Sequence, residues 1–353
     1  MICRIGGTKV AAGRKTRLSI IYNGKDISQN IKKYVESFRY TDVASGESDE
    51  IELELNNSSG MFIKGHMPRK GDKITSTIYR YNWDSSGSTI RFRCGKFYLD
   101  DLSYSGPPMA CTIGGVSSPV KGAFKSTKRS KTYKNVTIRE LARVIAKRSG
   151  MTLHYSAASV KIKEIEQSKT ADSEFLLSIC QEYGLGLKIF GGKIIIFDEE
   201  KYEQKAPKCT IKRCNCENWS WNTTLQGTYT GAKVTYTSPT DNKTHKVMIG
   251  KEGRVYHANV SASSTKEAVM KAKAQLAEQN KQRTTMQLTI MPGKTIVATD
   301  TIRLSGFYKL NGKYYVDKVE HAVTGESGYV QTLTLHKVTP RISNRVSVNS
   351  KGK

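Results

Sequence analysis

Polar and apolar residues alternate along much of the first third of the chain. The run Glu-Ile-Glu-Leu-Glu-Leu-Asn places Ile51, Leu53 and Leu55 on one face of a predicted strand. Residues 37–43 have the same period of two, and residues 73–80 form a further strand pattern beyond a polar break. Short strands separated by turn residues are typical of a small β-barrel or sandwich.

The pattern changes to a helical period after residue 136. Thr137 and Glu140 form a capping box, and apolar residues then recur at i, i+3, i+4 and i+7 from Ile138. Gly150 marks the end of this predicted amphipathic helix.

A near-repeat follows the helix. Residues 145–153 and 179–187 share one pattern, which is a helix end, a glycine and a strand with alternate apolar residues. Gly191 and Gly192 then predict a hairpin turn before a strongly β run. Two copies are too few for a solenoid, so these units predict a small α+β domain.

Strand patterns return after Pro207 and continue almost to the C-terminus. Ser264 and Glu267 cap a predicted helix that interrupts them. The remaining predicted strands cover residues 284–290, 296–304, 314–321 and 329–336.

Together these patterns predict a mostly β, α+β protein in which two β domains flank a small α+β domain. The predicted order is an N-terminal arm (1–14), a first β domain (15–120), a basic linker (121–135), an α+β domain with the near-repeat (136–206), a second β domain (207–340) with an inserted helix at 264–280, and a basic, disordered tail (341–353).

Composition adds a strong positive charge. The 353 residues include 57 Lys plus Arg and 31 Asp plus Glu, which gives a formal net charge of +26. Residues 121–150 hold ten basic residues and the single acid Glu140, but only Phe124 and Tyr133 could stack on bases there. A basic nucleic-acid-binding β protein is therefore the first alternative function. No apolar run approaches the roughly 20 residues that span a bilayer, so we expect a protein made in a cytoplasm.

The seven cysteines do not suggest a disulfide framework, because their number is odd and they are scattered. Cys209, Cys214 and Cys216 form the one cluster, and His245 or His257 could complete a zinc site with them. The usual Cys-x-x-Cys spacing is missing, so we expect reduced thiols, no metal and no cofactor.

Candidate catalytic groups are few. Asp100 and Asp101 are adjacent on a predicted strand, so they should point to opposite faces and could not flank one bond. Gly191 and Gly192 are not followed by a helix, which excludes a phosphate loop. An enzyme that acts on cell-wall polysaccharide is the weakest of three functional hypotheses, and we assign no catalytic, cofactor-binding or metal residue.

The order of several motifs resembles the baseplate hub family of contractile phage tails, which includes the late control D proteins and the hubs of defective prophage particles. The motifs, in chain order, are Ser-Asp-Glu before an alternating strand (48–53), Pro-x-x-Gly-Asp (68–72), Gly-x-Phe-x-x-Asp (95–100), Ser-Gly-Pro-Pro (105–108), Glu-Ala-x-x-x-Ala (267–272), a strand ending in Val-x-His (315–321), and Gly-Tyr-x-x-x-Leu (328–333).

This resemblance implies that residues 15–120 and 207–340 each form a tube-like β-barrel domain, and that the protein has a structural role without enzymatic activity. It implies a homotrimeric hub that joins the hexameric tail tube to the trimeric spike and forms part of the axial conduit of a contractile injection particle. The implied partners are the tail tube or a tube initiator, the spike, the tape-measure protein and other baseplate proteins, with DNA only in transit. The implied location is the baseplate centre of a virion or tail-like particle assembled in the bacterial cytoplasm, and the residues of the partner interface stay unassigned.

Overall fold

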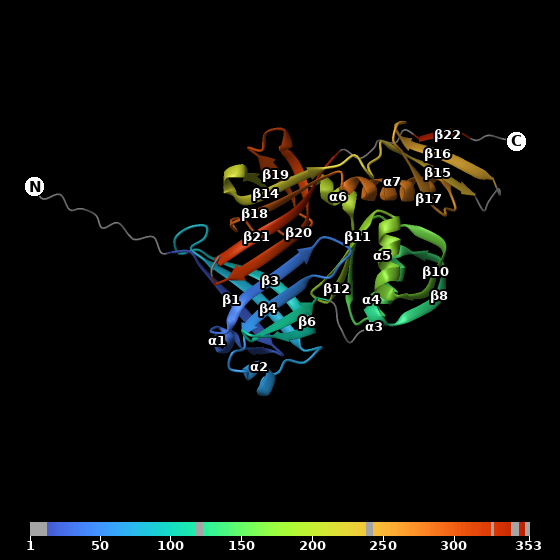
Figure 1. Ribbon diagram of the computed structural model, residues 1–353. Helices are drawn as coiled ribbons and strands as arrows, with labels where there is room; N and C mark the ends of the chain where they lie inside the picture. The colour runs from blue at the N-terminus through green and yellow to red at the C-terminus, as the bar shows by residue number, and fades with distance from the viewer. Residues whose placement is uncertain (1–12, 118–122, 238–242, 326–327, 340–345, 350–353) are drawn as a thin grey trace, which may run out of the picture.

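Strands make up most of the computed structural model, which describes residues 13–117, 123–237, 243–325, 328–339 and 346–349. The expectation of a mostly β, α+β protein is confirmed. Figure 1 shows a large sheet on one side of the molecule, with the α+β unit and a smaller sheet on the other side. Among the residues described, no helix is both long and apolar enough to cross a membrane.

Thirteen strands form the large sheet, and eleven of them follow one path in the order β14-β18-β21-β20-β3-β4-β7-β6-β5-β1-β2. Strands β13 and β19 pair with each other, and β19 also pairs with β20. The bounds are β1 Lys15–Tyr22, β2 Lys25–Asp26, β3 Val35–Val43, β4 Glu50–Asn56, β5 Lys73–Tyr81, β6 Thr89–Ser105, β7 Ala110–Val116, β13 Cys209–Lys212, β14 Cys216–Thr223, β18 Thr284–Ile290, β19 Thr301–Ser305, β20 Gly312–Thr324 and β21 Gly328–Lys337.

The N-terminal strands curl around one hydrophobic core. Ile51, Leu53 and Leu55 of β4 are buried in it, while Glu50 and Glu52 are exposed, so the predicted register is confirmed. Tyr329 of β21 belongs to the same core. Two one-turn helices, α1 (Ser28–Ile31) and α2 (Met61–Lys64), lie in the connections of this region.

The C-terminal strands β14, β18, β21, β20, β13 and β19 enclose a second core. Strand β20 pairs with β3, from Lys318 opposite Val43 to Thr324 opposite Ser37. The two segments that were predicted as separate barrels therefore share one hydrogen-bonded sheet, and no closed ring of strands occurs among the described residues. A strand was predicted over 296–304, but only β19 forms there, because residues 291–300 make a connecting loop.

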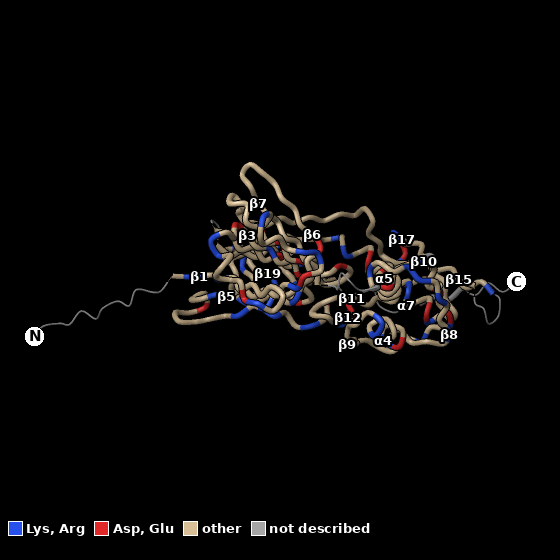
Figure 2. Tube along the Cα trace, turned by 90° about the horizontal axis from the view of Figure 1, so that it is seen from below, with Lys and Arg blue, Asp and Glu red and all other residues tan. Residues whose placement is uncertain are grey.

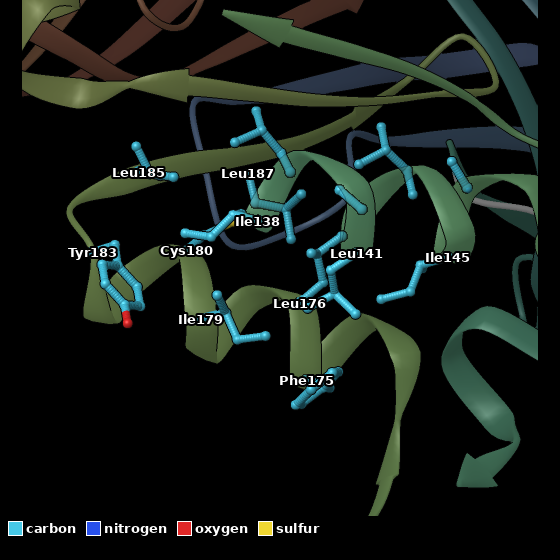
Figure 3. Packing of buried hydrophobic residues seen from close by; sticks show 14 of the residues in the cluster. Ile138, Leu141, Ile145, Phe175, Leu176, Ile179, Cys180, Tyr183, Leu185 and Leu187 are labelled. Carbon is cyan, nitrogen blue, oxygen red and sulfur yellow. The ribbon is translucent and has the colours of Figure 1, made fainter. Parts of the chain in front are cut away.

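The α+β unit contains both predicted helix–strand pairs. They are α4 (Ile138–Arg148) with β9 (Thr152–Ser156), and α5 (Asp172–Glu182) with β11 (Leu185–Phe190). Strand β12 (Lys193–Asp198) lies between β11 and β9. Figure 3 shows apolar side chains of α4 and α5, among them Leu141 and Leu176, packed together with Leu187 of β11.

The segment that was expected to be a basic linker is partly a strand. Strand β8 (Lys128–Thr137) pairs with β10 (Lys161–Ala171), and the short helix α3 (Ala123–Ser126) precedes it. Tyr133 of β8 is buried in the core of the α+β unit, which explains why this polar stretch is ordered.

The predicted inserted helix is present as α7 (Thr265–Lys281), capped by Ser264. It covers one face of a four-stranded sheet in the order β17-β15-β16-β22, with bounds β15 Gly231–Thr237, β16 Thr244–Gly250, β17 Val255–Asn259 and β22 Val346–Asn349. Because β22 pairs with β16, part of the expected disordered tail is a strand. The remaining short helices are α6 Glu199–Gln204, η1 Arg213–Asn215 and η2 Tyr308–Leu310.

Candidate functional site

A buried cluster of charges lies where the first β segment, the α+β unit and the C-terminal segment meet. Lys188 of β11 extends its ammonium group to the carboxylates of Asp42 and Asp49, at 2.6 and 2.7 Å, and donates to the carbonyl of Val43 at 2.6 Å. The backbone N–H of Ala298 donates to the other oxygen of Asp42 at 2.8 Å. We call these groups the Lys188 cluster.

Strand β3 carries Asp42, and the loop between β3 and β4 carries Asp49. Asp49 accepts hydrogen bonds from the N–H of Val43 and the hydroxyl of Tyr40, both at 3.1 Å. The loop also runs along β11, since Leu187 donates its N–H to Ser45 Oγ and accepts from the N–H of Gly46. This pairing brings the residue after Leu187 to the carboxylates.

A second buried cation holds the other part of the 291–300 loop. Arg80 of β5 is almost fully buried and donates to the carbonyl of Gly293 at 2.7 Å and to Thr295 Oγ1 at 3.0 Å. Ala298, three residues further on, is held by Asp42. The loop from the C-terminal segment is therefore fixed to the first β segment at two points.

The electrostatics favour a charged Lys188. Burial alone would lower the pKa of Lys188, but Asp42 and Asp49 outweigh that effect and raise it. Burial raises the pKa of Asp49 to about 6, although the nearby ammonium of Lys188 opposes the rise and the carboxylate of Asp42 adds to it. One ammonium thus balances two carboxylates, and the cluster carries no spare positive charge for a ligand.

A cavity of about 370 Å³ lies beside the Lys188 cluster. Aromatic rings form much of its wall, including Phe92, Phe190 and Tyr202, and Arg93 and His154 are exposed at it. The carboxylates of Asp42 and Asp49 are engaged by the ammonium of Lys188 beside this cavity. The arrangement fixes the relative positions of three chain segments.

Helix α7 forms a second junction with the α+β unit, which we call the α7 junction. Lys271 lies 2.8 Å from Glu182 of α5, and Lys281 lies 2.8 Å from Glu199 of α6. Tyr183 donates its hydroxyl proton to Glu267 at 2.7 Å. Figure 1 shows α7 between the four-stranded sheet and α5.

His336 of β21 lies at the edge of this junction, between two carboxylates. Its Nδ1 is 2.8 Å from Asp317, and its Nε2 is 3.7 Å from Glu203 of α6. Burial alone would lower the pKa of His336, but the two carboxylates outweigh it and raise the pKa to about 9. The imidazole is therefore a cation at neutral pH.

The cysteines and histidines considered for zinc are not brought together. Cys209, Cys214 and Cys216 lie on β13, η1 and the start of β14, whereas His245 and His257 lie on the separate four-stranded sheet. Among the residues described, no group of three or more potential ligands could hold a metal ion.

The remaining candidates from the sequence, the two adjacent aspartates and the Gly-Gly pair, lie in a strand and in a turn. A β-bulge between Leu99 and Asp101 breaks the alternation of β6, so Asp100 and Asp101 are both exposed instead of facing opposite sides. The strict period of two that was used to separate them does not hold there. Gly191 and Gly192 have positive φ and form the predicted hairpin turn between β11 and β12.

The basic stretch is partly neutralised inside the α+β unit. Arg148 pairs with the buried Asp172, and Arg129 lies 3.7 Å from the same carboxylate. Lys134 lies 3.6 Å from Glu164 of β10. The other basic residues of α4 are exposed, and Figure 2 shows Lys and Arg in several separate parts of the described trace.

Sequence reasoning missed Lys188. It lies between the buried residues Leu187 and Ile189, so the period of two predicts a solvent-facing side chain. Its partner Asp49 is 139 positions away, and that carboxylate was visible only as part of the Ser-Asp-Glu motif. A charge pair at this separation leaves no local pattern in one sequence.

The fold is similar to that of known tail proteins. The 43 kDa tail protein of prophage MuSo2 from Shewanella oneidensis matches with a TM-score of 0.70 and 13% identity, over 93% of this chain and 100% of that one. At this identity the likeness concerns the fold alone.

The sequence comparison is more specific. No protein-family model matches the chain. The probable baseplate hub proteins of Escherichia phage 186 and Escherichia phage P2 are each 25% identical to it, over 233 and 230 residues. Each match covers 64% of this chain and only 57% of the relative. The resemblance to baseplate hub proteins is confirmed, since both relatives are named as probable hub proteins.

Proposed function

We propose that this protein is a structural component of a tail baseplate, with the role of a hub. The observation that carries the proposal is that the first β segment, the α+β unit and the C-terminal segment are held in fixed positions by the Lys188 cluster and by the shared sheet. A protein that transmits load between other proteins needs such fixed internal geometry. The hub relatives and the tail-protein fold support the same role.

The finer proposal is a homotrimer that joins the sixfold tail tube to the threefold spike and lines part of the axial conduit. Each chain contributes two β segments, and the β3–β20 pairing places them side by side. Three chains would present six such segments, which fits a sixfold tube on one side and a threefold spike on the other. Strand β14 supports assembly, because it ends the sheet path and six of its eight residues are exposed.

This role implies a place at the baseplate centre of a virion or tail-like particle assembled in the host cytoplasm. The partners in this proposal are the tube or its initiator, the spike, the tape-measure protein and neighbouring baseplate proteins. DNA would only pass through the conduit.

The test is an electron-microscopy reconstruction of the intact particle. We expect three copies of this chain on the particle axis, between the tube and the spike. Six copies, or a position away from the axis, would contradict the hub assignment.

Nucleic-acid binding stays a second candidate because Arg139, Arg143 and Lys147 are exposed on one helix, at spacings that place them along one face of α4. A nucleic-acid-binding protein should lose duplex affinity steeply between about 50 and 200 mM salt. A hub should instead co-purify with tail proteins whether or not nuclease is added.

A further inference from the structure

The N-terminal part of the large sheet leaves a groove where it does not close on itself. The groove has a volume of about 430 Å³ and is lined by β1, by α1, by the start of β3 and by the end of β20. Its apolar lining comes from Leu18, Ile20, Ile31, Val35 and Val323. All five side chains belong to, or pack against, the core of the first β segment.

Strand β1 turns a backbone edge toward this groove. The N–H of Ile20 donates to Ser28 Oγ at 2.8 Å, and the carbonyl of Ile20 accepts from the N–H of Ile27 at 3.0 Å. Both groups of Ile20 therefore point away from β5. Because a strand repeats every two residues, Leu18 and Thr16 point their N–H and C=O groups to the same side. Among the described residues, no hydrogen bond engages these groups of Leu18 and Thr16.

The rim of the groove is basic. Lys15, Arg17 and Lys32 are exposed along it. Among the described residues that line the groove, Glu36 is the one acid, and its carboxylate accepts a hydrogen bond from Asn56 at 3.0 Å. A ligand that is complementary to this groove therefore has backbone groups that hydrogen-bond to β1, apolar side chains that pack on the apolar lining, and carboxylates that pair with the basic residues of the rim.

We propose that the groove binds an extended segment of a partner protein in which acidic and apolar residues alternate, and that this segment adds to β1 as a further strand. Main-chain hydrogen bonds to an exposed edge supply affinity in this mode of recognition, and alternate side chains supply specificity. The added strand lies in the groove, next to β1. The proposal goes beyond the hub role and does not depend on copy number in a particle.

The probe is a capped, fluorescently labelled peptide of about six alternating Glu and Val residues, which is the usual length of a strand. Two control peptides carry Lys in place of Glu, or Pro at a central position. Anisotropy titrations of the full chain should show the Glu peptide binding at least roughly tenfold more tightly than either control, which corresponds to about 1.4 kcal/mol. Absence of binding, or equal binding of all three peptides, contradicts the proposal.

Thr16→Pro and Thr16→Val form a matched pair of variants. Proline removes an N–H that faces the groove and takes no part in the pairing with β5, so the fold should persist while the added strand is blocked. Valine keeps the N–H and should bind like the parent. If Thr16→Pro fails to fold, Lys32→Glu serves instead, since this exposed side chain contributes charge alone and its reversal should weaken binding of the Glu peptide.

Other occupants give distinct results. If Thr16→Pro folds and still binds the Glu peptide as tightly as the parent does, the proposal is wrong. If Thr16→Pro does not fold, the same conclusion follows from undiminished binding of the Glu peptide by Lys32→Glu. If light scattering shows an oligomer of the parent that Thr16→Pro converts to a monomer, the occupant is a second copy and the proposal is wrong. If the peptide binds only after deletion of residues 1–12, the chain's own N-terminal segment takes the groove, which also contradicts it.

Discussion

The Lys188 cluster and the α7 junction both attach the α+β unit to the rest of the molecule, yet they do so by different means. In the cluster, one ammonium group serves two carboxylates and the side chain of Asp49 is fully buried. In the α7 junction, two ammonium groups, those of Lys271 and Lys281, each pair with two carboxylates, and the side chain of Glu278 is 56% exposed. The ion pairs that fix the α+β unit are thus concentrated on one ammonium in the Lys188 cluster and distributed along α7 in the α7 junction.

This difference predicts unequal tolerance to substitution. A buried ion pair contributes little net stability compared with apolar packing, but the loss of one partner leaves an uncompensated charge in a poorly solvated place. An exposed pair is screened and its remaining partner is rehydrated. The Lys188 cluster should therefore respond strongly to a single change, whereas outer pairs of the α7 junction should not.

The largest expected effect is that of Lys188→Ala. It leaves Asp42 and Asp49 facing each other without a cation, so it should reduce the free energy of unfolding by about 3–5 kcal/mol. Urea unfolding followed by circular dichroism measures this loss. The matched control is Lys193→Ala, because Lys193 is an exposed lysine on the neighbouring strand β12. Equal stability of the two variants would show that the cluster is not a critical junction.

Changing pH should affect the edge of the α7 junction through His336. Its folded pKa of about 9 exceeds the ordinary 6.5, so its contribution is complete below pH 6.5 and is lost as the pH rises through 9. A difference of this size corresponds to about 3 kcal/mol. Unfolding free energies measured between pH 6.5 and 9.5 should fall accordingly.

The control for this experiment is His336→Gln, which cannot titrate. Its unfolding free energy should vary less over the same pH range, because only the other titrating groups remain. A parent curve that runs parallel to that of His336→Gln would contradict the proposed charge on His336.

The sequence was sufficient to predict the individual helices and strands that carry both junctions. Periodicity placed Ile51 on the core face of β4, and the capping box located the start of α4 at Thr137. Helix α7 followed from the cap at Ser264 in the same way. These features depend on neighbours within a few positions, so one sequence contains their signal.

The arrangement of those elements could not be predicted in the same way. Pairing of β3 with β20 joins residues far apart in the chain, and nothing local in either strand specifies its partner. The ordered strand β8 was missed because its polar residues face solvent while Tyr133 alone is deeply buried. Asp42 and Lys188 were missed because their burial depends on this tertiary arrangement.

The smallest expected change in the free energy of unfolding is that of Glu278→Gln in the α7 junction. Glu278→Gln removes one of two acids near Lys281, but Lys281 keeps Glu199 at 2.8 Å, and Glu278 is largely solvated. The free energy of unfolding should change by less than about 0.5 kcal/mol, and even less in 0.5 M salt, because screening weakens exposed pairs. Glu199→Gln is the matched control, and its effect should be larger because the Glu199 side chain is only 15% exposed and its pair joins α6 to α7. If the two variants lose equal stability, burial does not set the strength of these pairs, and the distinction between a concentrated and a distributed junction fails.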